Sequence, residues 1–246
     1  MKILLTADLH SQREWYRWLI DNARDYDLVC IAGDLIDMFL RFELQASFLR
    51  DQWLPAFVST GVPLALTTGN HDWQINLWMG SELPLGVVGA GRTELITTAS
   101  GGEIVVTTCP YDSIFNELDP LMHRLWKEGA ALSKKWHLPW LVLAHEPPPQ
   151  LSPALVVNRL SSYIERYSPD YVSSGHFHEG PRVLGKFAER TGSTWCFNAG
   201  QEGKGSVPDH IVLEPEAARA TWVRTMPSNP RVPMHQSESR VVLHLD

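Results

Sequence analysis

Side chains that bind metal ions through oxygen or nitrogen recur in short clusters along this 246-residue chain. The clusters contain Asp, His and Asn but no Cys, and such ligands suit two adjacent divalent cations once water and substrate fill the remaining positions. We therefore predict a two-metal hydrolytic centre. The clusters are Asp8-Leu9-His10, Gly33-Asp34-Leu35-Ile36-Asp37, Gly69-Asn70-His71-Asp72, His145, Gly175-His176-Phe177-His178 and Asn198-Ala199-Gly200.

The first two clusters supply carboxylates. Asp8 and His10 are two residues apart, so an extended backbone turns both side chains toward one ion. Taken alone, this triplet also fits a helix-capping loop. Asp34 follows a glycine at a predicted strand end, where its two oxygens are suited to bridging two cations. An imidazole cannot bridge in this way, because each nitrogen offers one lone pair to one metal. If its motif stood alone, Asp34 could equally be an aspartate that stabilises a turn.

The later clusters supply neutral ligands. The amide oxygen of Asn70 is one, and the adjacent His71 points elsewhere and remains free to handle protons or stabilise charge. His176 and His178 follow a tight glycine turn and can serve different ions. His145 ends an apolar strand and precedes three prolines. Alone it fits a strand-end surface histidine, but the other clusters favour a ligand.

Three of the clusters follow predicted strands, at residues 2–7, 27–32 and 62–67. In α/β sheets, functional groups gather beyond the carboxyl ends of the strands, so we expect the ligands to converge. Between the strands we predict a helix over residues 15–24, opened by the capping box Ser11-Gln12-Arg13-Glu14, and a helix over residues 43–58 that is interrupted near Pro55.

Further along, apolar runs predict strands at residues 103–108, 139–144 and 171–173 and helices at residues 116–135 and 155–167. The runs at 193–197, 210–213 and 220–224 have no helices between them and favour an antiparallel part of a sheet. We expect one domain over residues 1–225. Residues 226–246 are expected to form a C-terminal extension with a linker, PSNPRVP, and an edge strand at 239–245.

The composition, 44% hydrophobic and 20% charged residues, is that of a globular protein with one large core. A formal charge of −7 argues against general binding to nucleic acid or anionic membrane.

Cys30, Cys109 and Cys196 lie in apolar runs without a CxxC pair, which predicts buried residues of a reduced compartment. The run from Ile3 to Ala7 is too short for a signal peptide, and no segment reaches the length of a membrane span. We therefore expect a cytoplasmic protein without a membrane partner.

The ordered set D-x-H, GDxxD, GNHD, a single strand-end His and GHxH resembles the calcineurin-like metallophosphoesterase superfamily, from Asp8 to His178. The resemblance implies an α/β fold, a four-layer α/β/β/α sandwich of two mixed β-sheets flanked by helices. It also implies two ligand sets that share one bridging aspartate, and it pairs His71, as the acid for the leaving group, with Asp37. Asn198 resembles a structural turn residue. The implied sets are Asp8, His10, Asp34 and His178 for one ion, and Asp34, Asn70, His145 and His176 for the other.

This resemblance implies a metal-dependent phosphoester hydrolase in which a metal-bridging hydroxide attacks phosphorus. We favour a phosphodiester over a phosphomonoester, because an acid at His71 helps most with alkoxide leaving groups. Mixed nitrogen and oxygen ligands suit Mn, Fe, Zn, Ni or Co, without deciding among them. Met38 and Asp72 depart from the pattern of the protein Ser/Thr phosphatases, which have Arg and Glu there, and His71 departs from the arginine typical of UDP-diacylglucosamine hydrolases.

Two alternatives remain open at this stage. One is a catalytically silent scaffold of the same fold that binds proteins, although no motif is missing here. The other is a nucleotide pyrophosphatase or a nuclease. We expect a small phosphoester as the substrate, and residues 116–135 and the loop from Trp73 to Trp78 are candidates for its rim; both also fit ordinary surface elements. The sequence does not indicate an oligomeric state.

Overall fold

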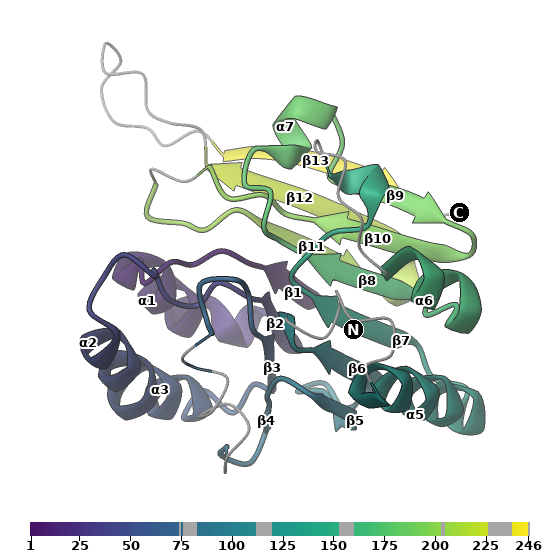
Figure 1. Ribbon diagram of the computed structural model, residues 1–246, viewed down its shortest axis with the longest axis horizontal. Helices are drawn as coiled ribbons and strands as arrows, with labels where there is room; N and C mark the ends of the chain where they lie inside the picture. The colour runs from purple at the N-terminus through teal and green to yellow at the C-terminus, as the bar shows by residue number, and fades with distance from the viewer. Residues whose placement is uncertain are drawn as a thin grey trace.

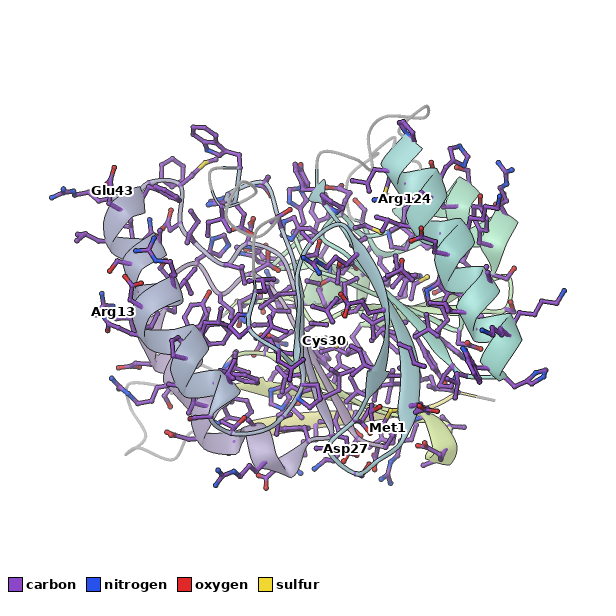
Figure 2. The ribbon with its side chains drawn as sticks, turned by 90° about the horizontal axis from the view of Figure 1, so that it is seen from below. Met1, Arg13, Asp27, Cys30, Glu43 and Arg124 are labelled. Carbon is purple, nitrogen blue, oxygen red and sulfur yellow. The ribbon has the colours of Figure 1, made fainter. Side chains whose placement is uncertain are left out.

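Two mixed β-sheets pack face to face, with helices on both outer sides (Figure 1). This computed structural model describes residues 1–73, 75, 83–111, 120–152, 160–202, 205–225 and 238–245. Figure 2 shows the same layers from another side, with Arg13 and Glu43 on one helical flank, Arg124 on the other and Cys30 in the interior. The arrangement confirms the predicted α/β/β/α sandwich.

The first sheet carries the amino-terminal clusters. Its strand order is β13-β12-β11-β1-β2-β3-β4. Strands β1 to β4 are mutually parallel, whereas β11 pairs antiparallel with β1, β12 with β11 and β13 with β12. The first three strands fall within the runs predicted from the sequence. The bounds are β1 Ile3–Thr6, β2 Leu28–Ala32, β3 Leu64–Thr67, β4 Val87–Val88, β11 His210–Glu214, β12 Arg219–Thr225 and β13 Glu238–His244.

The second sheet carries the histidine clusters of the carboxyl-terminal half. Its order is β5-β6-β7-β8-β10-β9, with four parallel strands in the middle and an antiparallel strand at each edge. The edge strands β5 and β9 have no counterpart in the sequence prediction. The bounds are β5 Arg92–Thr97, β6 Glu103–Cys109, β7 Trp140–Ala144, β8 Tyr171–Ser174, β9 Ala188–Thr191 and β10 Thr194–Asn198.

Alternating side chains bury both faces of each sheet. In β1, Leu4 packs under the helices, whereas Ile3 and Leu5 pack against the second sheet. In β7, Val142 faces the opposite helices and Leu141 faces the first sheet. Strands covered on both faces read as continuous apolar runs, which is the pattern the sequence shows.

The helices α1 Arg13–Asn22, α2 Phe42–Ser47 and α3 Leu54–Val58 cover the first sheet. The predicted interruption near Pro55 is confirmed: a π-helical segment, Phe48–Trp53, separates α2 from α3 just before the proline. Pro55 lies in the first turn of α3, where a missing N–H costs little. The predicted capping box is wrong: Gln12 precedes α1 without a side-chain hydrogen bond, and the Ser11 hydroxyl donates to Gln45 Oε1 instead.

On the other flank, α5 Pro120–Trp136 and α6 Leu160–Tyr167 cover the second sheet, and the short helix α7 Gly180–Leu184 follows β8. The helices predicted at residues 116–135 and 155–167 are described only in part, because residues 116–119 and 155–159 lie outside the described residues. The predicted linker also lies outside them. None of the described helices is long and apolar enough to cross a membrane. Cys30, Cys109 and Cys196 are buried and free.

Gly129 on α5 lies directly against the ring of Trp140, which is 1% exposed. A Cβ at this position would overlap the indole ring. Helix propensity alone favours Ala over Gly by about 1 kcal/mol, but overpacking a rigid core costs about 1–3 kcal/mol. We expect the overpacking to outweigh the propensity and Gly129→Ala to lower the free energy of unfolding by about 1 kcal/mol, measured by urea denaturation. The exposed neighbour Glu128→Ala serves as the control and should change it little; a Gly129→Ala variant as stable as the wild type would contradict the packing argument.

Candidate metal centre

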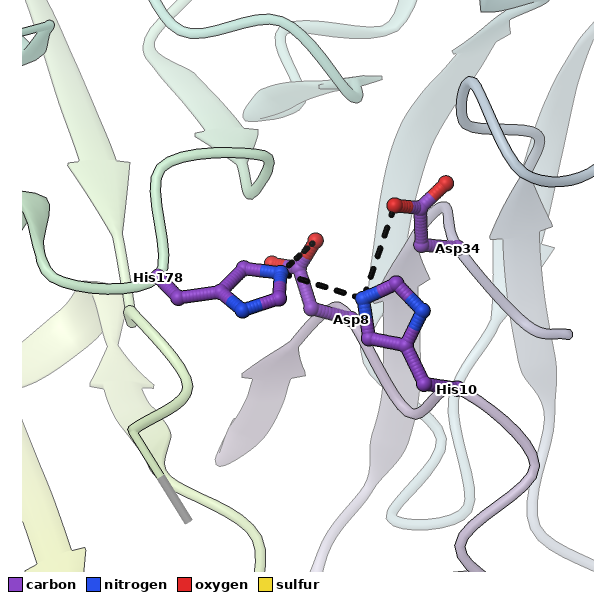
Figure 3. Close-up of side chains that lie close together, drawn as sticks. All are labelled: Asp8, His10, Asp34 and His178. Atoms are coloured by element: carbon purple, nitrogen blue, oxygen red, sulfur yellow. Dashed lines mark hydrogen bonds and ion pairs between the residues drawn. The ribbon is translucent and has the colours of Figure 1, made fainter. Parts of the chain in front are cut away.

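Asp8, His10, Asp34 and His178 form one group of potential ligands, with one ligand atom of each lying within 4.8 Å of the others (Figure 3). The two imidazoles meet through their Nε2 atoms, 3.0 Å apart. His178 Nε2 is 3.4 Å from Asp8 Oδ1, and His10 Nε2 is 3.6 Å from Asp34 Oδ2. The structure thus brings together the four residues that the resemblance assigns to one ion.

A second group forms around the side-chain oxygen of Asn70. Asn70 Oδ1 lies 2.8 Å from His176 Nδ1 and 3.0 Å from His145 Nε2. His145 Nε2 is in turn 3.4 Å from Asp34 Oδ2. On the far side of its ring, His145 Nδ1 donates to the Ala32 carbonyl at 2.8 Å, so Nε2 is the nitrogen that faces the group.

One oxygen of Asp34 belongs to both groups. Oδ2 faces His10 Nε2 from the first group and His145 Nε2 from the second. Oδ1 instead accepts the backbone N–H of His71 at 2.9 Å. The prediction that Asp34 bridges two cations through its two oxygens stays a prediction, because an oxygen that accepts one hydrogen bond keeps a second lone pair. One oxygen is held by the backbone, and the other is shared between the two groups.

The spacing of these atoms fits metal ions. Cations bound at about 2.0–2.2 Å with angles of about 90–109° place neighbouring ligand atoms about 2.8–3.6 Å apart. The contacts within the two groups run from 2.8 Å to 3.6 Å. The Nε2 atoms of His10 and His178, 3.0 Å apart, share one proton in a hydrogen bond, and both can bind a cation once that proton is lost. The donor set thus fits two divalent cations.

The ligand loops have an unusual backbone. Asp8, His10, Asp34 and His176 all have a positive φ, between 41° and 69°. Such conformations cost about 1–3 kcal/mol each and persist only where the surroundings impose them. Here the loop after β1 is fixed to the loop after β2, because Asp8 N–H donates to Gly33 O and His10 N–H to Asp34 O, both at 3.0 Å.

Two glycines allow the loops to approach. Gly33 has a φ of 90°, and a Cβ there would lie 2.6 Å from His145 Nδ1. A Cβ at Gly69 would overlap the side chain of Asp34. Larger residues at these positions would push the carboxylate and the imidazole away from the centre.

Asp72 connects the second and third ligand loops. Its buried carboxylate accepts the backbone N–H groups of Leu35 at 3.1 Å, Ile36 at 3.0 Å and Gly69 at 2.8 Å. Burial and the nearby charge of Asp34 raise the pKa of Asp72, and the three N–H donors oppose this shift. The last residue of the GNHD tetrad therefore positions the loops and does not face the ligand atoms.

Two further side chains hold the loops in place without having been expected to do so. Gln45 of α2, 6% exposed, accepts the N–H of Asp37 at 2.8 Å and donates to its carbonyl at 2.9 Å. Gln201 donates to the Ala7 carbonyl at 3.2 Å, directly before the first ligand loop. Neither glutamine has a spacing that marks it in the sequence.

Asn198 closes the last ligand loop. Its amide donates to Gly175 O at 3.2 Å and Phe177 O at 3.4 Å, and its oxygen accepts the Gly200 N–H at 2.8 Å. It contacts the backbone around His176 and His178 and no ligand atom. This geometry is that of a turn residue.

His71 lies beside the shared carboxylate oxygen. Its Nε2 is 3.9 Å from Asp34 Oδ2, on the side of the metal centre. Its Nδ1 accepts the Met38 N–H at 3.1 Å, and the Asp37 carboxylate lies 3.9 Å away, beyond hydrogen-bond distance. Asp37 Oδ1 accepts the N–H of Phe39 at 2.9 Å. The pairing of His71 with Asp37 is thus looser than the resemblance implies.

Burial and charge set the protonation of the ligands in the metal-free protein. Burial lowers the pKa of His10, and burial with the charge of His145 lowers the pKa of His176 to about 4. Burial would also lower the pKa of His145, but the carboxylates of Asp34 and Asp8 raise it. Burial would raise the pKa of Asp34, but His145 holds it well below its usual range. A protonated His145 therefore pairs with an ionised Asp34, and cations would replace that proton.

A model of the calcineurin-like phosphoesterase family matches residues 1–180, which include every ligand described above. The chain belongs to the calcineurin-like phosphoesterase family. Among curated proteins, none matches it significantly in sequence.

Solved structures show the same fold as this calcineurin-like phosphoesterase at low sequence identity. A dimetal phosphatase from Danio rerio is 11% identical with a TM-score of 0.61, over 90% of this chain and 95% of that one. The protein TT1561 of Thermus thermophilus is 14% identical with a TM-score of 0.59, over 88% and 95%. Purple acid phosphatase PPD1 from yellow lupin is 11% identical with a TM-score of 0.56, over 91% and 51%. Membership in the family supports a metal-dependent phosphoester hydrolase, and members of this family typically hold two divalent metals.

The expected substrate rim of this phosphoesterase is described only in part. Trp73 is 59% exposed, but residues 74 and 76–82 lie outside the described part. The described helix α5 packs against the second sheet through Met122, Leu125 and Trp126. A different segment, Met38-Phe39-Leu40, is exposed directly after the GDLID motif, with Phe39 84% exposed.

Replacing the shared carboxylate tests the metal centre. We expect Asp34→Asn to lose the bound metal, because a neutral amide removes the charge that both ligand groups use. Elemental analysis after reconstitution with Mn²⁺ and removal of free metal measures the loss. Asp37→Asn, in the same motif but outside the ligand groups, is the matched control and should keep its metal. Full occupancy in Asp34→Asn would contradict the shared role.

Proposed function

We propose that this protein is a dinuclear metal-dependent phosphodiesterase, with phosphomonoesters as the alternative substrates. The observation that carries the proposal is the convergence of two ligand groups on Asp34 Oδ2, with His71 Nε2 beside the same oxygen at 3.9 Å. The residues that would hold the ions are Asp8, His10, Asp34 and His178 for one, and Asp34, Asn70, His145 and His176 for the other.

When bound, two divalent cations supply an activated water at neutral pH and neutralise the charge of the phosphoryl oxygens. The donor set of imidazole, carboxylate and amide oxygen suits Mn, Fe, Zn, Ni or Co. The protein contributes the positions of these donors, which are fixed by the loop contacts described above, so no reorganisation is needed when the substrate arrives.

His71 is suited to the leaving group. The Met38 N–H donates to Nδ1, so Nδ1 is the acceptor of the ring and the ring proton lies on Nε2. Nε2 thus carries a proton toward the metal centre. The ring can therefore donate a hydrogen bond to the departing oxygen, and in its charged state it can transfer the proton.

The preference for diesters rests on two features beside His71. An alkoxide leaves poorly without a proton, so a donor at this position matters most for unactivated esters. In addition, the exposed ring of Phe39 lies 6.0 Å from the ring of His71, and Met38 and Leu40 are also exposed. A diester carries organic groups on two of its oxygens, where a monoester has one, and these apolar side chains offer a surface for such groups.

Replacing His71 tests its role. We expect His71→Ala to lower kcat on an alkyl phosphodiester by about 10²–10⁴-fold, the usual contribution of general acid catalysis. The loss should be much smaller on a p-nitrophenyl diester, whose leaving group needs no proton. Metal content should stay at the wild-type value, since His71 lies outside both ligand groups.

His137 is exposed, and His137→Ala is the control for the removal of an imidazole elsewhere in the chain. Equal losses on the two esters would count against proton donation. Unchanged turnover of the alkyl ester in a metal-replete His71→Ala protein would reject it.

A further inference from the structure

A buried carboxylate beside the second ligand group has no place in the function described so far. Glu146 directly follows His145 after β7 and is 1% exposed. Its Oε1 has no hydrogen-bond partner in the described part of the chain. Its Oε2 lies 3.5 Å from His176 Nε2. Burying a carboxylate without full pairing is costly, so its retention here requires a reason.

Glu146 contacts the His176 ring at the nitrogen that faces away from the second ligand group. His176 presents Nδ1 to Asn70 Oδ1 at 2.8 Å, and Nε2 points away from the ligand atoms toward Glu146. A neutral imidazole carries one proton, and an acceptor at Nε2 favours the tautomer with the proton there. Nδ1 then keeps its lone pair for a cation. At 3.5 Å, the contact is longer than the usual N–H···O distance of about 2.7–3.2 Å, so Oε2 is an acceptor in contact with Nε2, and the two atoms do not form a full hydrogen bond.

His145 provides a comparison within the same group. Its far nitrogen, Nδ1, donates to the Ala32 carbonyl at 2.8 Å, so the backbone fixes its tautomer. For the far nitrogen of His176, the acceptor in contact is the Glu146 carboxylate. The two histidines on Asn70 are thus oriented by different kinds of acceptor, one neutral and one anionic.

We propose that Glu146 is a positioning residue that fixes the tautomer and orientation of His176, and thereby sets the affinity of the second metal site. The proposal rests on the proposed function, because it requires His176 to be a ligand. Partners of this kind typically change metal affinity by about 10–100-fold. Glu146 itself is no ligand in this scheme, since it lies on the opposite side of the imidazole from Asn70.

The test is a stepwise Mn²⁺ titration of the chelator-treated full chain by isothermal titration calorimetry. Glu146→Gln keeps the shape but removes the charge, and it should weaken one of the two binding steps by about 10–100-fold, which assigns that step to the second site, while the other step is unchanged. Glu103→Gln, at an exposed position at the start of β6, is the matched control and should leave both steps unchanged. Glu146→Asp provides a second variant if Glu146→Gln does not fold.

A double-mutant cycle separates positioning from a general structural effect. If Glu146 acts through His176, Glu146→Gln should have no further effect on the step assigned to the second site in a His176→Ala background. The ¹⁵N chemical shifts of His176 in the metal-free protein should report the proton on Nε2 in the wild type and a shift toward the other tautomer in Glu146→Gln.

Equal weakening of both steps, additive effects in the cycle, or an unchanged tautomer would each overturn the role of Glu146. A wild-type protein that binds a single Mn²⁺ ion would overturn the dinuclear centre itself, so the two failures are distinguishable.

Discussion

The arrangement of the centre depends on the different partners of the two Asp34 carboxylate oxygens. Its Oδ1 is held by the backbone N–H of His71, and this bond directs Oδ2 to a point where histidines of both ligand groups reach it. A freely rotating carboxylate could satisfy one group at the expense of the other. The structure around it, from the left-handed backbone of Asp34 to the nearby glycines, keeps the side chain in this single orientation.

The surrounding contacts form a chain of support that runs outward from the ligands to the helices. Asp72 holds the loops after β2 and β3, and Gln45 connects the loop with the GDLID motif to α2. The helix in turn is held by Phe42, which is partly buried and packs against the core over the first sheet. Packing far from the centre therefore determines the precision of the ligand positions, as general arguments on preorganised sites require.

The strands that carry the clusters could be predicted from the sequence because their signals are local, whereas the four-layer fold and the grouping of the ligands came from the resemblance of the ordered motifs to a known family. Apolar runs that end in Gly-Asp or Gly-Asn mark both the strand and the ligand. The edge strands β5 and β9 were missed because half-exposed strands lack a continuous apolar run. Gln45, Gln201 and Glu146 were missed for a different reason. The partners of Gln201 and Glu146 lie far away in the chain, Gln45 contacts Asp37 across a loop, and nothing in the spacing of the three residues indicates these contacts. The capping box failed because the Ser11 hydroxyl found a partner across the structure.

The ligands come from both sheets: Asp8, Asp34 and Asn70 follow strands of the first, and His145, His176 and His178 follow strands of the second. Ions held between them would act as a cross-link across the interface of the sandwich. Binding to the folded state alone adds about 2.7 kcal/mol for each site at about 100 times its Kd. The resistance of this protein to unfolding and proteolysis would then follow the free metal concentration around it, and metal starvation would shorten its lifetime as well as reduce its turnover.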